Sequence, residues 1–388
     1  MSSVADDAAL PLNGIKILDL GVILSAPFAA RSLQDLGASI VKVEPLDGDP
    51  LRGGPAAKGA RRYQFVACNR GRRSLAVDLK SDEGRLILLR LVEQADVLIE
   101  NFRPGVTARL GIEYESLKAK NPRLVHCTIG GFREDSPLAK PPNTDGVVQA
   151  FSGLLELTGS GGLPGMPIPM ALADQIAGTT ATEAIVAALF RRERTGKGTH
   201  ITLNMFESLM SWMHASAIGR VKLEPPGTWI LRTGDDKLIL VQPALHFFKG
   251  FANVVAARAG TDVLLADERF QTPDSRTSNV QALIPILNEA FLRDTSASWL
   301  AALAAAGVPA GSINTLGEAL SAPEVEATMV DFDGEEMAIV GSPYSFDGTR
   351  AAVATSGPGL GEHNNEILAE AGYSQDEIDN LREKRVVA

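Results

Sequence analysis

The sequence has few of the residues that build disulfide frameworks and metal centres. Two cysteines, Cys68 and Cys127, stand in a chain of 388 residues, which excludes a disulfide scaffold and a zinc cluster. The five histidines are scattered and show no metal-ligand spacing. No apolar run reaches the length of about 18 residues that a transmembrane helix needs. We therefore expect no metal site and no membrane span.

Basic residues are outnumbered by acidic ones. Lys and Arg number 37 against 47 Asp and Glu, which gives a net charge of −10. A general nucleic-acid binder needs surplus cations to displace the counterions of phosphate, so we expect no nucleic-acid partner and no attachment to anionic lipid. Residues 1–9 carry no basic region and no apolar stretch, so no secretory signal is predicted. The expected location is cytoplasmic.

Short apolar runs alternate with amphipathic stretches through the first 200 residues, which is typical of a parallel α/β sheet with a Rossmann-like plan. The pattern predicts strands at 15–20, 39–44, 97–100 and 123–129, and helices at 27–36 and 80–95. Further helices are predicted at 145–157 and 173–194, and a last one at 374–383 after the cap residue Ser374. Residues 222–228 (KLEPPGT) are typical of a linker that leads into a smaller α/β unit.

Three polar residues are candidates for chemistry. Asp174 stands at the start of the predicted helix 173–194, where free backbone N–H groups and the helix dipole stabilise a carboxylate anion. In a dry pocket it would be a nucleophile, whereas a simple helix cap is the more common role there. Asp145 and Gln149 are four residues apart and share a helix face, so they could orient a substrate. A cap and a surface glutamine are the alternative for this pair.

A local surplus of cations lies between Arg52 and Val77, where no acidic residue occurs. Its seven members are Arg52, Lys58, Arg61, Arg62, Arg70, Arg72 and Arg73. In an acidic chain this favours a phosphate-binding surface, with a solvated basic face as the alternative. The glycines form no recognised cofactor-binding or nucleophile motif. The turn after the first strand, GVILSAP, is not a dinucleotide fingerprint, and no Walker A or G-x-S-x-G motif occurs. A nicotinamide-dependent dehydrogenase and a serine hydrolase are therefore disfavoured.

Six segments taken in order carry a resemblance to one family. Two βαβ patterns come first, residues 11–52 and then residues 69–112 with the turn ENFRPG, followed by residues 171–209 (ALADQIAGTTATEAIVAALFRRERTGKGTHITLNMFESL). Three C-terminal pieces complete the set: GVPAGSINTLGEALSAPEVEA, GSPYSF and PGLGEHNNEIL. Together they resemble the class III CoA-transferases, a family that also contains the α-methylacyl-CoA racemases. The match covers nearly the whole chain.

The resemblance implies an enzyme that moves CoA from an acyl-CoA to a free carboxylic acid. Asp174 matches the family's nucleophilic aspartate, which attacks the thioester to form an acyl-aspartyl anhydride and then an aspartyl-CoA thioester. Asp145 and Gln149 match a polar pair beside it. Because an anhydride hydrolyses readily, the site must exclude water.

The resemblance also implies which residues bind CoA. Ile23, Leu24 and Ser25 match a loop near the thioester, and Val77 and Lys80 match contacts to the adenine. Asn101, Phe102 and Arg109 match the turn that holds the pantetheine and the phosphates of CoA. Met205 matches a contact near the reacting centre. We add Arg72 and Arg73 from the cation-rich stretch as expected phosphate contacts.

The family's architecture is an interlocked homodimer of ring-like chains. It implies a large CoA-binding domain at 1–221 and 340–388 and a small domain at 229–330, joined by linkers. Two departures stand out: Thr144 occupies the position of the histidine that the racemases need, and residues 224–236 lack the glycine run of the transferases' lid. A racemase is therefore the first alternative, and a CoA-binding protein without turnover the second.

Overall fold

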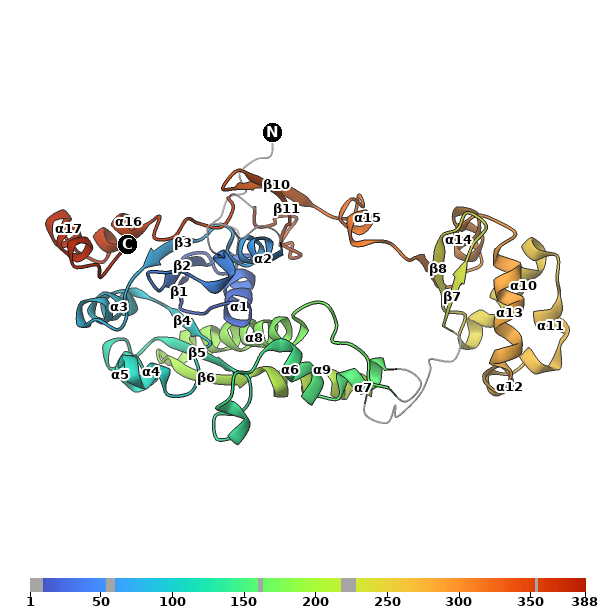
Figure 1. Cartoon of the computed structure of the whole chain (residues 1–388), viewed down its shortest axis with the longest axis horizontal. Helices are drawn as coiled ribbons and strands as arrows, with labels where there is room; N and C mark the ends of the chain where they lie inside the picture. The colour runs from blue at the N-terminus through green and yellow to red at the C-terminus, as the bar shows by residue number, and fades with distance from the viewer. Residues whose placement is uncertain (1–9, 54–59, 160–162, 218–227, 353–354) are drawn as a thin grey trace. The chain divides into compact units, whose positions relative to one another are not determined.

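The computed structural model describes residues 10–53, 60–159, 163–217, 228–352 and 355–388. The chain divides into two compact units, one made of residues 1–218 and 326–388 and the other of residues 219–325 (Figure 1). Residues 222–227 of the predicted linker lie outside the described residues.

A six-stranded sheet forms the centre of the first unit, and all of its pairs are parallel. Its order is β3-β2-β1-β4-β5-β6, the doubly wound order of Rossmann-like folds. The strands are β1 (Lys16–Asp19), β2 (Ser39–Glu44), β3 (Arg73–Ala76), β4 (Val97–Glu100), β5 (Val125–Gly130) and β6 (Thr199–Asn204). The predicted parallel α/β class is confirmed, although β3 and β6 were not predicted. Both are edge strands, and β6 alternates between exposed and half-buried positions instead of forming an apolar run.

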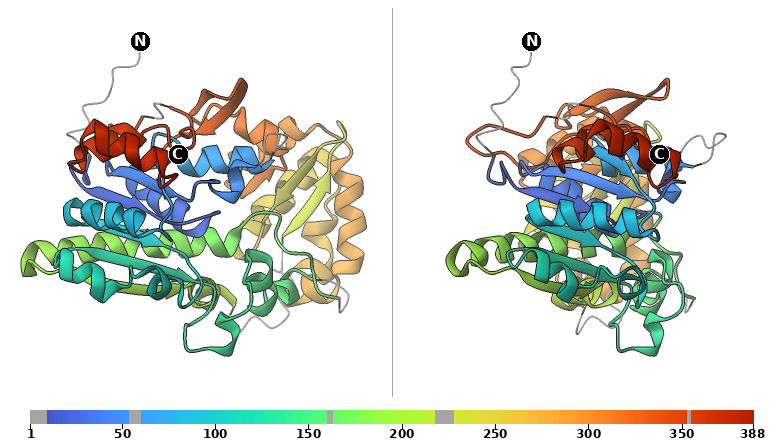
Figure 2. Two further views of the ribbon diagram at one scale, coloured as in Figure 1. Left: turned by 60° about the vertical axis from the view of Figure 1, so that its left-hand side comes forward. Right: turned by 90° about the vertical axis from the view of Figure 1, so that its left-hand side faces the viewer.

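Helices cover both faces of this sheet (Figure 2). Alternate side chains of each strand point to opposite faces, so Ile17 and Val97 join one core while Leu18 and Leu98 join the other. The first core is built by α1 (Ser25–Gln34), α8 (Leu172–Thr195) and α9 (Met205–Ala217). The second is built by α3 (Asp82–Gln94), α5 (Tyr114–Lys120), α16 (Asn364–Glu370) and α17 (Gln375–Glu383). The chain's C-terminal segment thus completes a core begun by its N-terminal half.

Smaller elements complete the first unit. They are α2 (Ala60–Asn69), α4 (Val106–Leu110), α6 (Asp145–Phe151), α7 (Leu154–Thr158) and the hairpin β10 (Ala327–Phe332) with β11 (Glu335–Val340). The single helix predicted over 145–157 is wrong, because Gly153 at φ 83° separates α6 from α7. The predicted last helix is confirmed, with Ser374 and Glu377 forming a reciprocal capping box at its start.

The second unit is an antiparallel three-stranded sheet packed against helices. Its strands are β7 (Trp229–Arg232), β8 (Leu238–Val241) and β9 (Ala310–Ser312), and its helices are α10 (Phe248–Ala259), α11 (Val263–Ala266), α12 (Pro273–Ser278), α13 (Val280–Phe291), α14 (Ser296–Ala305) and α15 (Leu316–Leu320). Its core contains the stacked rings of Phe291 and Trp299, whose centroids are 4.0 Å apart. Both rings are fully buried, so this unit has a hydrophobic core of its own.

Helices α1 and α8 pack closely against each other, and a glycine makes this possible. A Cβ added at Gly178 of α8 would lie 2.8 Å from the carbonyl oxygen of Ser25 and 3.0 Å from the ring of Phe28. Any side chain there would push the start of α1 away from α8.

We expect Gly178→Ala to destabilise the protein by about 1–3 kcal/mol through overpacking. Gly146→Ala, in α6 with no atom within 4 Å of the added Cβ, is the matched control, and we expect it to be neutral or to stabilise by up to about 1 kcal/mol. Denaturant unfolding measures both. Equal effects of the two substitutions would show that α1 and α8 do not pack as closely as described.

Candidate active site

Asp174 lies in the first turn of α8, whose N-terminus is capped from another helix. The N-cap residue Ala171 supplies no side-chain hydrogen bond. Instead, Oδ1 of Asp145, at the start of α6, accepts the N–H groups of Ala173 at 2.6 Å and Asp174 at 3.1 Å. Asp145 therefore acts as the missing cap, and its negative charge is held next to that of Asp174.

Gln149 is buried and uses both ends of its amide within the protein. Its Nε2 donates to Oδ2 of Asp145 at 2.5 Å and to the carbonyl of Met170 at 3.2 Å, while its Oε1 accepts the N–H of Ile168 at 2.9 Å. With 0% of its surface exposed, Gln149 cannot orient a substrate by direct contact. It orients Asp145 and the segment that leads into α8. Both sequence readings of Gln149, as a substrate contact and as a surface residue, are corrected by this burial.

The carboxylate of Asp174 meets the N-terminus of α1 as well. The hydroxyl and the backbone N–H of Ser25, the first residue of α1, face this carboxylate and lower its pKa through hydrogen bonding. The N-termini of α1 and α8 thus converge on one carboxylate, and both carry partial positive charge. This is the contact that Gly178 permits.

The pKa of Asp174 is raised to about 7. Burial is the main cause and the charge of Asp145 adds to it, while the two hydrogen bonds from Ser25 act in the opposite direction. A carboxyl group so far from its ordinary pKa of 3.8 is typical of a functional site. At neutral pH the group is poised between its neutral and its nucleophilic form.

Asn101 joins the end of β4 to the turn between β1 and α1. Its Oδ1 accepts the N–H of Val22 at 2.9 Å, and its Nδ2 donates to the carbonyl of Val22 at 2.8 Å and to Oγ of Ser25 at 3.1 Å. Strands β1 and β4 are the neighbours at which the strand order reverses. The crevice at the carboxyl ends of such strands is where doubly wound folds bind ligands. Ser25, Asn101 and Asp174, which the family resemblance implies for this site, therefore lie together.

The other expected CoA contacts are divided between surface and core. Ile23 is 45% exposed beside Ser25, and Lys80 and Arg109 are exposed. Phe102 is partly buried. The side chains of Leu24, Val77 and Met205 pack in hydrophobic cores, so these positions can offer a ligand little beyond their backbone.

Four of the seven cations in the cation-rich stretch have side chains that the structure describes, and all four are paired with acids from outside the stretch. Arg72 pairs with Asp19 at 2.5 Å, and both side chains are 0% exposed. The expectation that Arg72 binds a phosphate is therefore wrong: its guanidinium is enclosed and also donates to Asn69 and to the carbonyl of Pro27. Arg73 is partly exposed but pairs with Glu370 at 2.6 Å. Two more members are paired in the same way, Arg52 with Glu44 and Arg70 with Asp35. Lys58 and the side chains of Arg61 and Arg62 lie outside what the structure describes.

Neither a metal centre nor a membrane span is visible in the described parts of the chain. No group of three or more His, Cys, Asp or Glu side chains there is arranged to hold a metal ion. Among the helices of the described residues, none is both long and apolar enough to cross a bilayer.

Comparison with known proteins gives the family. The family model of CoA-transferase family III matches residues 12–364. The chain is 34% identical to the acetyl-CoA:oxalate CoA-transferase of Acetobacter aceti, over 87% of this chain and 90% of that protein. It is 32% identical to the succinate–glutarate CoA-transferase of Agrobacterium fabrum, over 93% of this chain and 95% of that protein. A crystal structure of a CAIB/BAIF family protein from Brucella suis superposes with a TM-score of 0.82 at 33% identity, over 94% and 100% of the two chains. The chain belongs to CoA-transferase family III, which confirms the resemblance, and it is a CoA-transferase.

The charge of Asp145 is expected to set the pH dependence of the site. Asp145→Asn keeps an oxygen that can cap α8 but removes the negative charge that raises the pKa of Asp174. The pKa of Asp174 should then fall below 7, and the acidic limb of kcat/KM against pH should move to lower pH. Asp135→Asn, at an exposed carboxylate paired with Arg133, is the control. An unmoved limb in Asp145→Asn would mean that Asp145 does not act on Asp174 through its charge.

Removal of the Asp174 charge should stabilise the protein, and more so at high pH. The folded-state pKa is raised, so this group favours folding below its ordinary pKa of 3.8 and loses that contribution as pH rises through about 7. The difference in unfolding free energy between Asp174→Asn and the wild type should therefore grow by at most about 3 kcal/mol from about pH 5 to about pH 9, at 1.36 kcal/mol for each pKa unit. Unfolding in denaturant across this range measures the difference. A difference that stays constant with pH would refute the raised pKa.

Proposed function

We propose that this enzyme moves CoA from an acyl-CoA donor to a free carboxylic acid acceptor, with Asp174 as the covalent nucleophile. The observation that carries the proposal is the carboxylate of Asp174, held between the N-termini of α1 and α8 with a pKa of about 7. Burial removes water from a carboxylate and makes it a stronger nucleophile. The Ser25 donors would fix its orientation beside the carboxyl ends of β1 and β4.

The first half of the reaction releases the donor acid. A carboxylate oxygen of Asp174 attacks the thioester carbonyl, the C–S bond breaks, and CoA leaves as a thiolate with the electron pair. The product is a mixed anhydride of the acyl group and Asp174. The thiolate then attacks the aspartyl carbonyl of this anhydride, which expels the donor carboxylate and leaves CoA on Asp174 as a thioester.

The second half repeats these steps in reverse order with the acceptor. The acceptor carboxylate attacks the aspartyl thioester, forms a new anhydride and releases the CoA thiolate. The thiolate attacks the acceptor's carbonyl, so the new acyl-CoA forms and the Asp174 carboxylate returns. Carboxylates and thiolates exchange in every step, so no proton transfer is needed. The residues around Asp174 therefore have to hold and desolvate it and need not act as acids or bases.

CoA is proposed to lie along the exposed edge near Ile23, Asn101 and Phe102, with Lys80 and Arg109 toward its phosphates. This placement is supported by the exposure of Ile23, Lys80 and Arg109 and by the position of Asn101 at the switch point of the sheet. The two relatives named above transfer CoA between acetate and oxalate or between succinate and glutarate, by their names. A small mono- or dicarboxylic acid is accordingly the proposed acceptor.

We also propose that the enzyme is a homodimer. Apolar side chains of α6 and α9 are exposed in the single chain, with Val147 at 49%, Phe151 at 55% and Trp212 at 57%. A second copy of the chain would cover such a surface.

A racemase is less well supported by the same geometry. Its chemistry needs two opposed bases at the α-carbon, and Thr144, exposed at the start of α6, supplies none. Two of the histidines, His126 and His200, contact each other on β5 and β6. Neither is among the groups that perturb the pKa of Asp174.

The covalent intermediate tests the proposal. The protein is incubated with acetyl-CoA or succinyl-CoA, quenched with hydroxylamine, and analysed by peptide mass spectrometry. We expect a hydroxamate on Asp174 and CoA transfer to oxalate, succinate or glutarate. Asp174→Ala should lower transfer by about three orders of magnitude or more.

Glu183→Ala is the control, because Glu183 lies on the same helix but is exposed. It should retain both the adduct and the activity. Transfer by Asp174→Ala at wild-type rate, or α-proton exchange in heavy water without an acceptor acid, would refute the proposal.

A further inference from the structure

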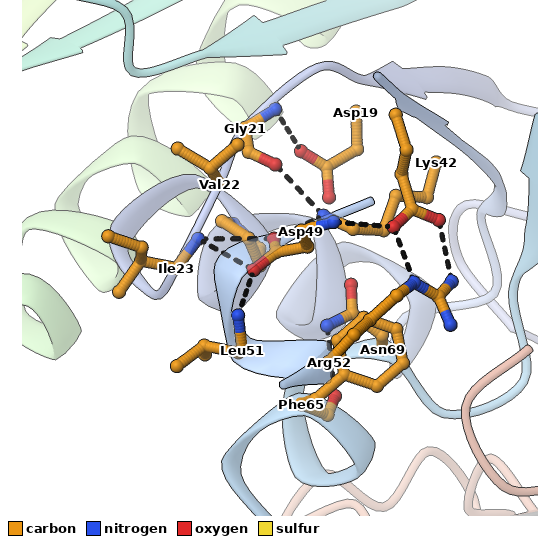
Figure 3. Close-up of polar contacts among 12 residues, drawn as sticks. Asp19, Gly21, Val22, Ile23, Lys42, Asp49, Leu51, Arg52, Phe65 and Asn69 are labelled. Atoms are coloured by element: carbon orange, nitrogen blue, oxygen red, sulfur yellow. Dashed lines mark hydrogen bonds and ion pairs between the residues drawn. The ribbon is translucent and has the colours of Figure 1, made fainter. Parts of the chain in front are cut away.

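The turn between β1 and α1 is held by side chains (Figure 3). The N–H of Gly21 donates to Oδ1 of Asp19 at 2.9 Å, and the carbonyl of Gly21 accepts from Nζ of Lys42 at 2.9 Å. The N–H of Ile23 donates to the carboxylate of Asp49, at 3.1 Å and 3.4 Å to its two oxygens. With Val22 bound by Asn101, the path of the chain into Ser25 depends on a few buried side chains.

Ile23 adopts a backbone conformation that isoleucine avoids. Its φ is +64°, and among the described residues it is the only β-branched one with a positive φ. The Cβ branch crowds the backbone in this region, so the conformation persists only where the surroundings impose it. The hydrogen bond to Asp49 imposes it here, two residues before the donors that face Asp174.

Lys42 and Asp49 form an ion pair that none of the catalytic steps uses. Nζ of Lys42 lies 3.1 Å from Oδ2 of Asp49, and both side chains are 0% exposed. A buried ion pair is a poor source of stability, because desolvation of the two charges offsets their attraction. The contacts that the pair makes to the turn after β1 indicate another role.

Asp49 is itself held in place by Glu44 and Arg52. Oε2 of Glu44 accepts the N–H of Asp49 at 3.1 Å, and the same carboxylate holds Arg52 through two bonds of 2.6 Å and 2.7 Å. Arg52 also donates to the carbonyl of Pro358 at 2.8 Å. These contacts leave the Asp49 carboxylate little freedom to follow the turn if the turn relaxes.

We propose that Lys42 and Asp49 are positioning residues, which hold residues 21–24 in the conformation that presents the N–H and hydroxyl of Ser25 to Asp174. They touch neither substrate nor the reacting carboxylate. Their effect passes through the carbonyl of Gly21 and the N–H of Ile23. The inference rests on the proposed role of Asp174 as nucleophile.

The test replaces the ion pair by apolar groups of similar size, Lys42→Met/Asp49→Leu. No unpaired charge is left in the core, so the variant should fold with a Tm close to that of its control. The turn should relax, because Ile23 loses its acceptor and Gly21 its donor. With the Ser25 donors displaced, kcat should fall about tenfold to a hundredfold. The acidic limb of kcat against pH should move up by about half a pH unit or more, because the Ser25 bonds that lower the pKa of Asp174 are lost.

The matched control is Arg70→Met/Asp35→Leu. This pair is also buried, with an N–O distance of 2.6 Å, and Asp35 caps the end of α1 opposite Ser25. We expect its kcat to stay within about twofold of wild type, with an unmoved acidic limb. If Lys42→Met/Asp49→Leu does not fold, Asp49→Asn with Asp35→Asn as its control provides the same two readouts.

The outcomes separate this inference from the proposed function. If the wild type forms no adduct on Asp174, the proposed function fails. If the wild type forms the adduct but Lys42→Met/Asp49→Leu keeps the wild-type kcat and acidic limb, the positioning role fails alone. The positioning role also fails if Arg70→Met/Asp35→Leu lowers kcat and shifts the acidic limb as much as Lys42→Met/Asp49→Leu does. The effect would then come from a general loss of stability.

Discussion

The site depends on one unfavourable arrangement, two carboxylates at the start of a single helix. Asp145 caps α8 with its Oδ1, and Asp174 lies in the turn that it caps. Burial, with the charge of Asp145 adding to it, raises the pKa of Asp174 to about 7, and the Ser25 donors act in the opposite direction. The arrangement costs stability and in return keeps a desolvated carboxylate ready to attack. Such local conflict is typical of catalytic sites.

The fold supplies the means to hold this arrangement. In the order β3-β2-β1-β4-β5-β6 the strand order reverses between β1 and β4, and the turn after β1 meets Asn101 at the carboxyl ends of these two strands. Gly178 lets α8 approach α1 closely enough for Asp174 to reach Ser25. Gln149, far from being a substrate contact, fixes Asp145 and the segment before α8. Precision at the carboxylate therefore comes from residues that never meet the substrate.

Sequence reasoning succeeded where the signal is local and failed where it is distant in the chain. Apolar runs located β1, β2, β4 and β5, and the position of Asp174 at a helix start was read correctly. The cation-rich stretch was misread, because the acids that neutralise Arg72 and Arg73 are Asp19 and Glu370, about 50 and about 300 residues away. Counting charges within a window cannot detect ion pairs that form only when strands and helices assemble. The burial of Gln149 was missed for the same reason, since residues 168–170 wrap it only in the fold.

The most direct test of this account is the titration of Asp174 in the resting enzyme. Carbon NMR of protein labelled at the aspartate carboxyl carbons follows each group through its pKa. The account predicts a resonance that titrates near pH 7 and is absent from Asp174→Asn. If every aspartate titrates below about pH 5, as ordinary carboxyl groups do, the central claim of a desolvated, charge-perturbed nucleophile is contradicted.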